Sequence, residues 1–164
     1  MPTREDAPRG LELTSRDFRH GEPIPAGFTC EGDGRSPALA WSGVPVETRS
    51  FVLVCDDPDA PRGTWQHWLL YNLPAEAVEL DAGVPPKPEL PSGARQGIND
   101  SGDVGYGGPC PPPGKPHRYF FRLHALDIML NLPPGVSRAD LDQAMAGHVL
   151  AVGTLMGTYE RPRR

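Results

Sequence analysis

Apolar residues in this chain gather in short runs separated by polar turns, a pattern typical of β-strands. Residues 50–57 (SFVLVCDD) form a continuous apolar run, which predicts a strand covered on both faces. Residues 64–73 (TWQHWLLYNL) indicate a second strand, whose alternation would place His67 and Trp68 on opposite faces. Further strands are predicted at residues 11–15, 39–42, 117–128 and 149–159.

Helical spacing of apolar residues is clear only in residues 137–148 (SRADLDQAMAGH), where Ser137 is a candidate N-cap. Residues 101–116 (SGDVGYGGPCPPPGKP) form a long Gly/Pro segment, and loops of this length are often functional. Strands do not alternate with helices. We therefore predict a mostly β fold, an antiparallel two-sheet β-sandwich with one or two short helices.

Length and charge narrow the class of protein. A chain of 164 residues predicts one domain, which we place at residues 11–161 after a disordered segment at residues 1–10. The net charge of −5 argues against a nucleic-acid partner. No apolar stretch is long enough for a transmembrane helix, and the polar start is unlike a secretory signal, so we expect a cytoplasmic protein.

Three cysteines suit a reducing compartment. Cys55 lies in the apolar strand and is expected to be buried and unreactive. Cys110 lies in the Gly/Pro loop and is expected to be the most accessible thiol. A disulfide between Cys30 and Cys110 is the less favoured alternative in the cytoplasm.

Charge is concentrated in residues 56–68 (DDPDAPRGTWQHW). Asp57 and Asp59 leave one strand and His67 lies on the next, and a short turn makes the two strands neighbours in space. The three side chains would then face one pocket. In this tight turn we also predict a cis peptide bond between Ala60 and Pro61.

Each of these residues also has a purely structural interpretation. Asp before Pro favours turns, and a histidine between tryptophans can be a hydrogen-bonded core residue. Tyr119 by default belongs to the core. Trp65 and Trp68 are expected to pack rather than to contact a ligand, and His124 and His148 to be structural.

Four motifs together resemble the two signature regions of the phosphatidylethanolamine-binding protein family, which includes the Raf kinase inhibitor proteins. The motifs are DPDAP (57–61), WQHW (65–68), GYGGPCPP (105–112) and HRYFF (117–121). The likeness covers residues 11–161 and is greater to the bacterial branch. Animal members carry Gly where this chain has Cys110, and a C-terminal helix beside the pocket that this chain lacks, which implies a more open pocket mouth.

The resemblance implies a β-sandwich with a small anion-accepting pocket at one edge. The residues that match the family's pocket positions, or lie in the loop that would approach the anion, are Asp57, Asp59, His67, Gly108, Cys110, Pro111, Pro112, His117 and Tyr119. In a phosphoethanolamine-like ligand, a carboxylate would pair with the ammonium or orient a histidine. Charged histidines and loop N–H groups would hold the phosphate.

We therefore expect a non-enzymatic protein that binds a small anionic or phosphorylated ligand without a cofactor and regulates a kinase or protease partner. The alternative is a hydrolase that uses the Asp/His pocket for acid–base or metal-assisted chemistry. Neither G-x-S-x-G nor H-E-x-x-H occurs, and no metal ligand is predicted. Apolar positions in residues 149–159 lead us to expect a homodimer.

Overall fold

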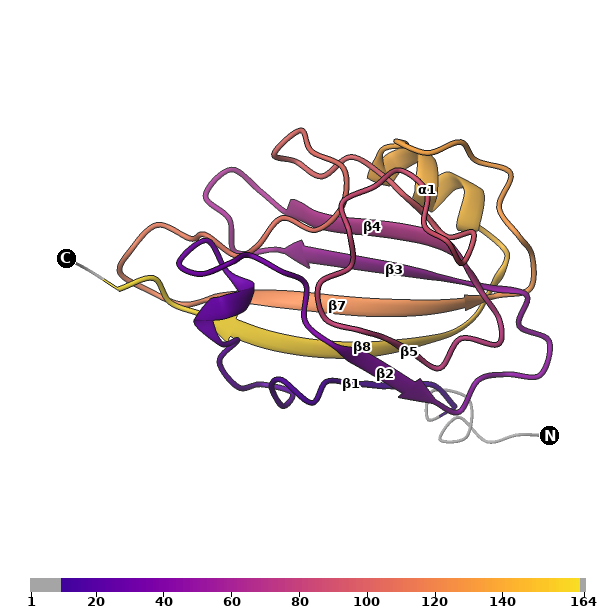
Figure 1. Cartoon of the computed structure of the whole chain (residues 1–164), viewed down its shortest axis with the longest axis horizontal. Coiled ribbons are helices and arrows are strands. Elements are labelled where there is room, and N and C mark those ends of the chain that lie inside the picture. Colours follow the sequence, from indigo (N-terminus) through magenta and orange to yellow (C-terminus); the bar gives the residue numbers. More distant parts are fainter. Residues whose placement is uncertain (1–9, 163–164) are drawn as a thin grey trace.

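The computed structural model describes residues 10–162, which form two antiparallel β-sheets that face one another (Figure 1). The larger sheet has five strands, in the order β6 (Arg95–Gln96), β4 (Trp65–Pro74), β3 (Ser50–Asp57), β7 (His117–Leu126) and β8 (Val149–Tyr159). The smaller sheet has three strands, in the order β1 (Glu12–Thr14), β2 (Leu39–Ser42) and β5 (Glu79–Leu80). The predicted β-sandwich is confirmed.

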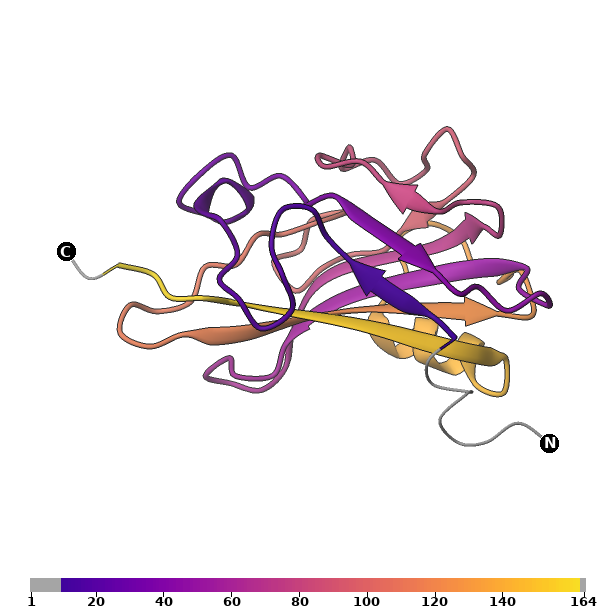
Figure 2. The same cartoon turned by 90° about the horizontal axis from the view of Figure 1, so that it is seen from below.

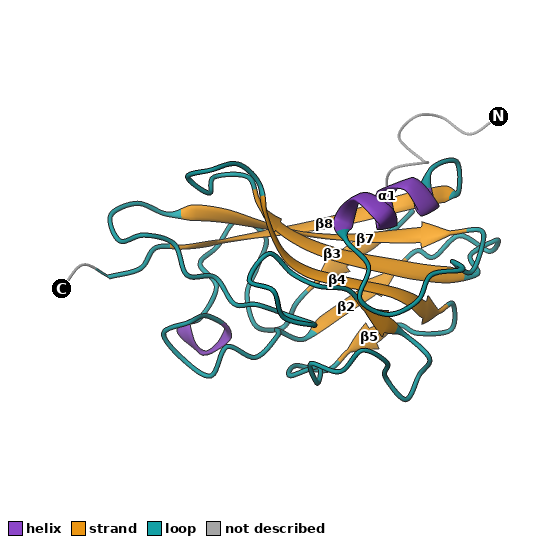
Figure 3. Ribbon diagram, turned by 90° about the horizontal axis from the view of Figure 1, so that it is seen from above, coloured by secondary structure: helices purple, strands orange, loops and turns teal. Residues whose placement is uncertain are grey.

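The central strand β3 is buried at every position because both faces of the larger sheet are covered. The smaller sheet packs on one face (Figure 2), where Phe51 and Leu53 enter the core between the sheets. The one α-helix of the described residues, α1 (Arg138–Met145), covers part of the other face (Figure 3), where Val52 and Val54 pack with Leu141 and Met145 of the helix. This two-sided burial is what the continuous apolar run predicted.

Helix α1 begins as predicted. The Ser137 side chain accepts a hydrogen bond from the backbone N–H of Asp140 at 3.2 Å, which satisfies one of the free donors of the first turn. The helix ends earlier than predicted, and Gly147 follows with a φ of +82°, a conformation that glycine adopts without strain. Among the described residues, no helix is long and apolar enough to cross a membrane.

An irregularity in strand β4 changes the predicted facing of its residues. Cys55 pairs with Trp68 and the next residue, Asp56, pairs with Gln66, so His67 is an extra residue without an opposite partner, as in a β-bulge. The prediction that His67 and Trp68 lie on opposite faces is therefore wrong. Trp68 enters the core between the sheets, and the His67 ring meets the Tyr119 ring edge-on at 5.2 Å.

The turn between β3 and β4 contains no cis peptide bond, so the prediction for Ala60–Pro61 is wrong. Side-chain and glycine chemistry closes the turn instead. Asp57 Oδ1 accepts a hydrogen bond from the backbone N–H of Asp59 at 2.7 Å. The N–H of Gly63, with φ +112°, donates to the carbonyl of Ala60 at 3.1 Å.

Between β4 and β7 the chain is mostly loop, as predicted, apart from the two-residue strands β5 and β6. No sequence pattern predicted the short 3₁₀ turn Ala26–Phe28, which lies beside this loop region. The predicted disorder of residues 1–10 falls, except for Gly10, outside the described residues.

Candidate functional site

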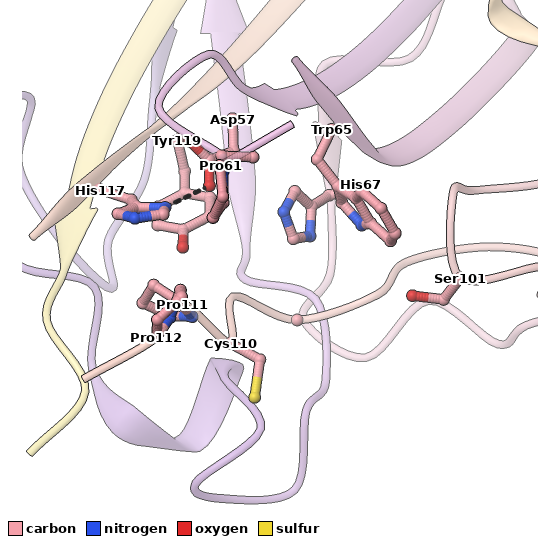
Figure 4. A pocket seen from close by; sticks show the side chains of 12 residues that line it. Asp57, Pro61, Trp65, His67, Ser101, Cys110, Pro111, Pro112, His117 and Tyr119 are labelled. Carbon is pink, nitrogen blue, oxygen red and sulfur yellow. Dashed lines mark hydrogen bonds and ion pairs between the residues drawn. The ribbon is translucent and has the colours of Figure 1, made fainter. Parts of the chain in front are cut away.

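A cavity of about 260 Å³ opens at the edge of the larger sheet where β3 ends and β4 and β7 begin (Figure 4). Three parts of the chain meet there: the β3–β4 hairpin, the 101–112 loop and the start of β7. The lining residues are Asp57, Ala60, Pro61, Trp65, His67, Ser101, Gly108, Cys110, Pro111, Pro112, His117 and Tyr119. Of the residues expected in the site, the cavity thus contains all except Asp59.

The inner wall holds a buried carboxylate–histidine pair. Asp57 is the last residue of β3 and His117 the first of β7, so the antiparallel pairing of these strands brings them together. The Nδ1–H of His117 donates to Asp57 Oδ2 at 2.7 Å, and both residues are buried. Because Asp57 fixes Nδ1, the nitrogen of His117 that remains for a ligand is Nε2.

Asp59 points away from the cavity and makes a double hydrogen bond with an arginine. Arg118 donates from Nη2 to Oδ1 and from Nε to Oδ2, each at 2.9 Å, and its backbone N–H donates to Oδ2 at 2.9 Å. These bonds from Arg118 lower the pKa of the Asp59 carboxyl. The expected convergence of both carboxylates in one pocket is therefore not found, and Asp59 holds the β3–β4 turn against β7.

His67 is bound to the loop through two reciprocal hydrogen bonds. Its Nδ1–H donates to the carbonyl of Gly107 at 2.7 Å, and the N–H of Gly107 donates to the His67 carbonyl at 2.8 Å. Burial lowers the pKa of His67 and outweighs the opposing effects of the Gly107 bond and of nearby carboxylates such as Asp57. The lowered pKa contradicts the expectation of a charged His67. At neutral pH its Nε2 is a hydrogen-bond acceptor.

Tyr119 contributes a buried hydroxyl that has no hydrogen-bond partner among the described residues. Burial, and then the negative charge of Asp57, raises the pKa of this phenol, so the hydroxyl stays protonated and is a donor. In Figure 4 the hydroxyl points into the space bounded by His117, His67 and Pro111. Buried donors are nearly always satisfied, so a donor without a partner that faces a cavity indicates where a ligand acceptor would lie.

The outer wall is formed by the Gly/Pro loop. A Cβ at Gly108 would lie 2.9 Å from the carbonyl oxygen of Phe28, so only glycine allows this close approach. The next cavity residue in the loop, Cys110, forms a disulfide with Cys30, which corrects the expectation of a free, accessible Cys110 thiol. Cys55 is buried as predicted, and burial raises the pKa of its thiol.

A sequence model of the phosphatidylethanolamine-binding protein family matches residues 14–160. The chain belongs to this family. A "UPF0098 protein" of Methanothermobacter thermautotrophicus is 50% identical over 151 residues, which cover 92% of this chain and 99% of that protein. Another from Aquifex aeolicus is 51% identical over 153 residues, covering 92% and 89%.

Two crystal structures of related proteins have the same fold. A phosphatidylethanolamine-binding protein homologue from Chlamydia trachomatis is 43% identical, with a TM-score of 0.85, and the match covers 93% of this chain and 98% of the other. YbcL of Escherichia coli, described as a member of the mammalian family, is 36% identical with a TM-score of 0.86, covering 93% and 99%. The family membership expected from the four motifs is confirmed.

Four residues that line the cavity were not predicted from the sequence: Ala60, Pro61, Trp65 and Ser101. Trp65 was expected to pack in the core, yet it is 40% exposed at the pocket. Trp68 does pack, and its indole N–H donates to Gln96 Oε1 at 2.7 Å. The position of Trp65 two residues before His67, on the same predicted face, was the available signal.

Proposed function

We propose that this protein is a binding protein whose pocket takes the phosphate group of a small phosphate monoester. The observation that carries the proposal is the buried, protonated and unpartnered hydroxyl of Tyr119, aimed into the cavity. Phosphate oxygens are strong acceptors for such a donor. Membership of the phosphatidylethanolamine-binding protein family supports a ligand-binding role.

The polar groups around the Tyr119 hydroxyl suit a phosphate that carries one proton. The Nε2 of His117 is the nitrogen that would face a phosphate oxygen, since Asp57 holds its other nitrogen. The Nε2 of neutral His67 would accept from a phosphate P–OH, since Gly107 holds its Nδ1–H. Trp65 and Pro112, both exposed, border the same cavity and would contact the organic part of the ester.

An ammonium ligand for Asp57, as in a phosphoethanolamine headgroup, is less well supported. Both carboxylate oxygens already accept hydrogen bonds, from Asp59 N and from His117 Nδ1. We therefore favour the phosphate as the recognised group and expect phosphoethanolamine and phenyl phosphate to bind with similar affinity. Calorimetric titration with both compounds tests this.

The decisive experiment removes only the hydroxyl. Tyr119→Phe should weaken phenyl phosphate binding about tenfold, the usual effect of losing one hydrogen bond to a charged group. The free protein should not lose stability, because the hydroxyl has no protein partner to lose. Calorimetry and urea unfolding measure the two effects.

Thr48 supplies a matched control. It carries the other buried hydroxyl without a partner among the described residues, and it precedes the end of β3 that is far from the pocket. Thr48→Val should likewise keep stability and should leave phenyl phosphate affinity unchanged. Equal affinity of wild type and Tyr119→Phe would reject a phosphate bound at this hydroxyl.

Action by binding rather than catalysis is part of the proposal. A hydrolase with a covalent intermediate would need a side-chain nucleophile beside the Asp57–His117 pair, and no side-chain hydroxyl or thiol among the described residues hydrogen-bonds to His67 or His117. We expect no release of inorganic phosphate from phenyl phosphate. Steady release that is lost in His117→Ala would establish the hydrolase alternative instead.

Partner, assembly and compartment remain predictions. Inhibition of a kinase or a protease, and a cytoplasmic location, rest on the resemblance and on the sequence pattern. The expected homodimer has one supporting feature: Val149, Leu150 and Val152 are partly exposed on β8, an outer strand of the larger sheet. Light scattering at micromolar concentration that shows only a 17.8 kDa species would reject the dimer.

A further inference from the structure

One residue of the pocket wall is covalently bonded to a distant part of the chain. Cys110 lines the cavity, and its disulfide partner Cys30 lies 80 residues away in the loop that follows the 3₁₀ turn. Two hydrogen bonds accompany this link. The N–H of Cys30 donates to the Pro109 carbonyl at 3.0 Å, and the Tyr106 hydroxyl donates to the Phe28 carbonyl at 2.7 Å.

Beyond Cys110 the wall has little other support. Residues 111–116 form no hydrogen bond to another segment of the described chain, and the prolines at 111, 112, 113 and 116 have no N–H to donate. The segment is fixed at the disulfide and again at His117, where β7 begins. Pro111 and Pro112, which face Tyr119 across the cavity, lie on this weakly supported span.

The disulfide is open to reagents, whereas the third cysteine is not. Cys30 and Cys110 are both solvent-exposed, while Cys55 is 1% exposed within the core. Thiol–disulfide exchange requires access to a sulfur atom, so it is confined to the bond at the pocket wall. A change in redox state would therefore act on the pocket and leave the core intact.

We propose that the Cys30–Cys110 disulfide is a redox-controlled latch that holds the pocket wall in its ligand-binding position; the effect on ligand rests on the proposed phosphate site. A dithiol reductant supplies the electrons. One of its thiolates attacks a sulfur of the disulfide, the Cys30–Cys110 bond breaks, and a mixed disulfide forms. The second thiol of the reductant resolves it, so that two electrons and two protons end on Cys30 and Cys110 and the dithiol becomes a disulfide.

Reduction releases residues 109–116 from the loop that contains Cys30. Pro111 and Pro112 then spend only part of the time opposite Tyr119 and His117. Apparent affinity falls in proportion to the fraction of molecules in the binding-competent state. A wall that is in place about one tenth of the time gives about tenfold weaker binding.

The test compares phenyl phosphate binding by oxidised wild type, by wild type reduced with dithiothreitol and desalted without oxygen, and by a Cys30→Ser/Cys110→Ser double variant. We expect about tenfold weaker binding in the last two, recovery when the reduced wild type is reoxidised, and no response of the double variant to dithiothreitol. Alkylation of the reduced native protein should modify two cysteines and spare Cys55. Equal affinity of the oxidised and reduced wild type, or resistance of the native disulfide to dithiothreitol, overturns the latch.

A second readout does not depend on the ligand. Hydrogen exchange of the Cys30 amide, which is bonded to Pro109, should accelerate on reduction, while the amide of Leu53 in the central strand should not change. If oxidised wild type does not bind phenyl phosphate, the proposed function fails. The latch is then decided by exchange alone: acceleration at Cys30 supports a released wall, and unchanged exchange overturns it.

Discussion

Two adjacent carboxylates at the end of β3 have the same chemistry and opposite surroundings. Asp56 faces the helix side of the larger sheet, and Asp57 faces the cavity between β3 and β7. Both residues are buried. Asp56 accepts hydrogen bonds from Arg122 at 3.0 Å and from Arg138 of α1 at 3.1 Å, and Arg138 also binds Gln66 and Asp142.

The difference lies in where each network ends. The Asp56 network ends on protein groups, and it fastens α1 to the sheet. The Asp57 network runs through His117 to a nitrogen beside an open cavity, next to the unpartnered hydroxyl of Tyr119. A buried charge alone does not mark a site. A binding site is indicated by a network of buried polar groups whose hydrogen bonds are completed only when a ligand is bound.

The strongest test of this contrast is Asp56→Asn. The change leaves two partly buried arginines without their shared counter-charge and should lower the free energy of unfolding by about 2–3 kcal/mol, since breaking a buried ion pair is costly. Urea denaturation measures the loss. Phenyl phosphate affinity of the folded variant should stay as in wild type. A loss of affinity as large as that of an Asp57 variant would show that the two networks are not independent.

Asp57→Asn is the paired change on the other face. The neutral amide oxygen can still accept a hydrogen bond from His117, but it does not stabilise the charged ring as a carboxylate does. Phenyl phosphate should therefore bind roughly tenfold more weakly, equivalent to about 1.4 kcal/mol. Calorimetry near pH 6.5 gives the affinity. His117→Ala should show a similar loss, and combining both changes should add little, because Asp57 acts through His117. Additive losses would mean that Asp57 contacts the ligand itself.

Lowering the pH should lower the stability of the folded protein, partly through a histidine of the pocket. Burial lowers the pKa of His67 and also that of His124, so below about pH 6.5 the unfolded chain binds protons that the folded chain does not. Stability should be highest above this range and fall as pH drops through it. Melting temperatures at pH 7 and pH 5 measure the slope.

The same measurement separates the two histidines. His67→Gln should reduce the slope, and saturating phenyl phosphate should change the slope of wild type and of this variant by different amounts, because only wild type has a titrating ring against the bound phosphate. His124 hydrogen-bonds weakly to the Val52 carbonyl at 3.4 Å and does not line the cavity, so His124→Gln should reduce the slope whether or not ligand is present. If the pH dependence of the wild-type melting temperature is the same with and without phenyl phosphate, His67 does not contact the ligand.

The smallest effect is expected from Asp59→Asn. Its partner Arg118 is mostly exposed, and exposed ion pairs contribute little to stability. The turn remains closed by the hydrogen bond from the Asp59 backbone N–H to the Asp57 carboxylate, so affinity should fall less than in Asp57→Asn. Calorimetry on both variants in one buffer makes the comparison. An equal loss would give Asp59 the pocket role that the resemblance implied.

Short sequence patterns predicted those parts of the fold that depend on interactions between residues close together in the sequence. The continuous apolar run predicted the central strand β3, and a serine before a helical repeat predicted the start of α1. The four motifs predicted the family, and most of the expected residues surround one cavity. Asp59 could not be placed, because its direction depends on Arg118, far along the chain.

The remaining errors share a cause in long-range structure. His67 faces Tyr119 because strand β4 has one extra residue between the pairs Cys55–Trp68 and Asp56–Gln66, and register belongs to the pair of strands. The disulfide was judged from an assumed compartment, whereas the fold brings Cys30 and Cys110 to a Cα–Cα distance of 5.4 Å. Neither the strand register nor the approach of the two cysteines can be predicted from a short stretch of sequence.

The size and position of the cavity limit which part of a ligand can enter it. At about 260 Å³ it lies below the usual range for drug-sized ligands, and it opens at the end of the sheet. A phosphate and a few further atoms fill it, so the rest of a larger molecule must remain outside. On the proposed function, the pocket therefore binds a terminal phosphate group and the few atoms next to it, and makes no contact with the rest of a larger ligand. A free metabolite and the exposed tip of a much larger assembly would present it with the same chemical signal.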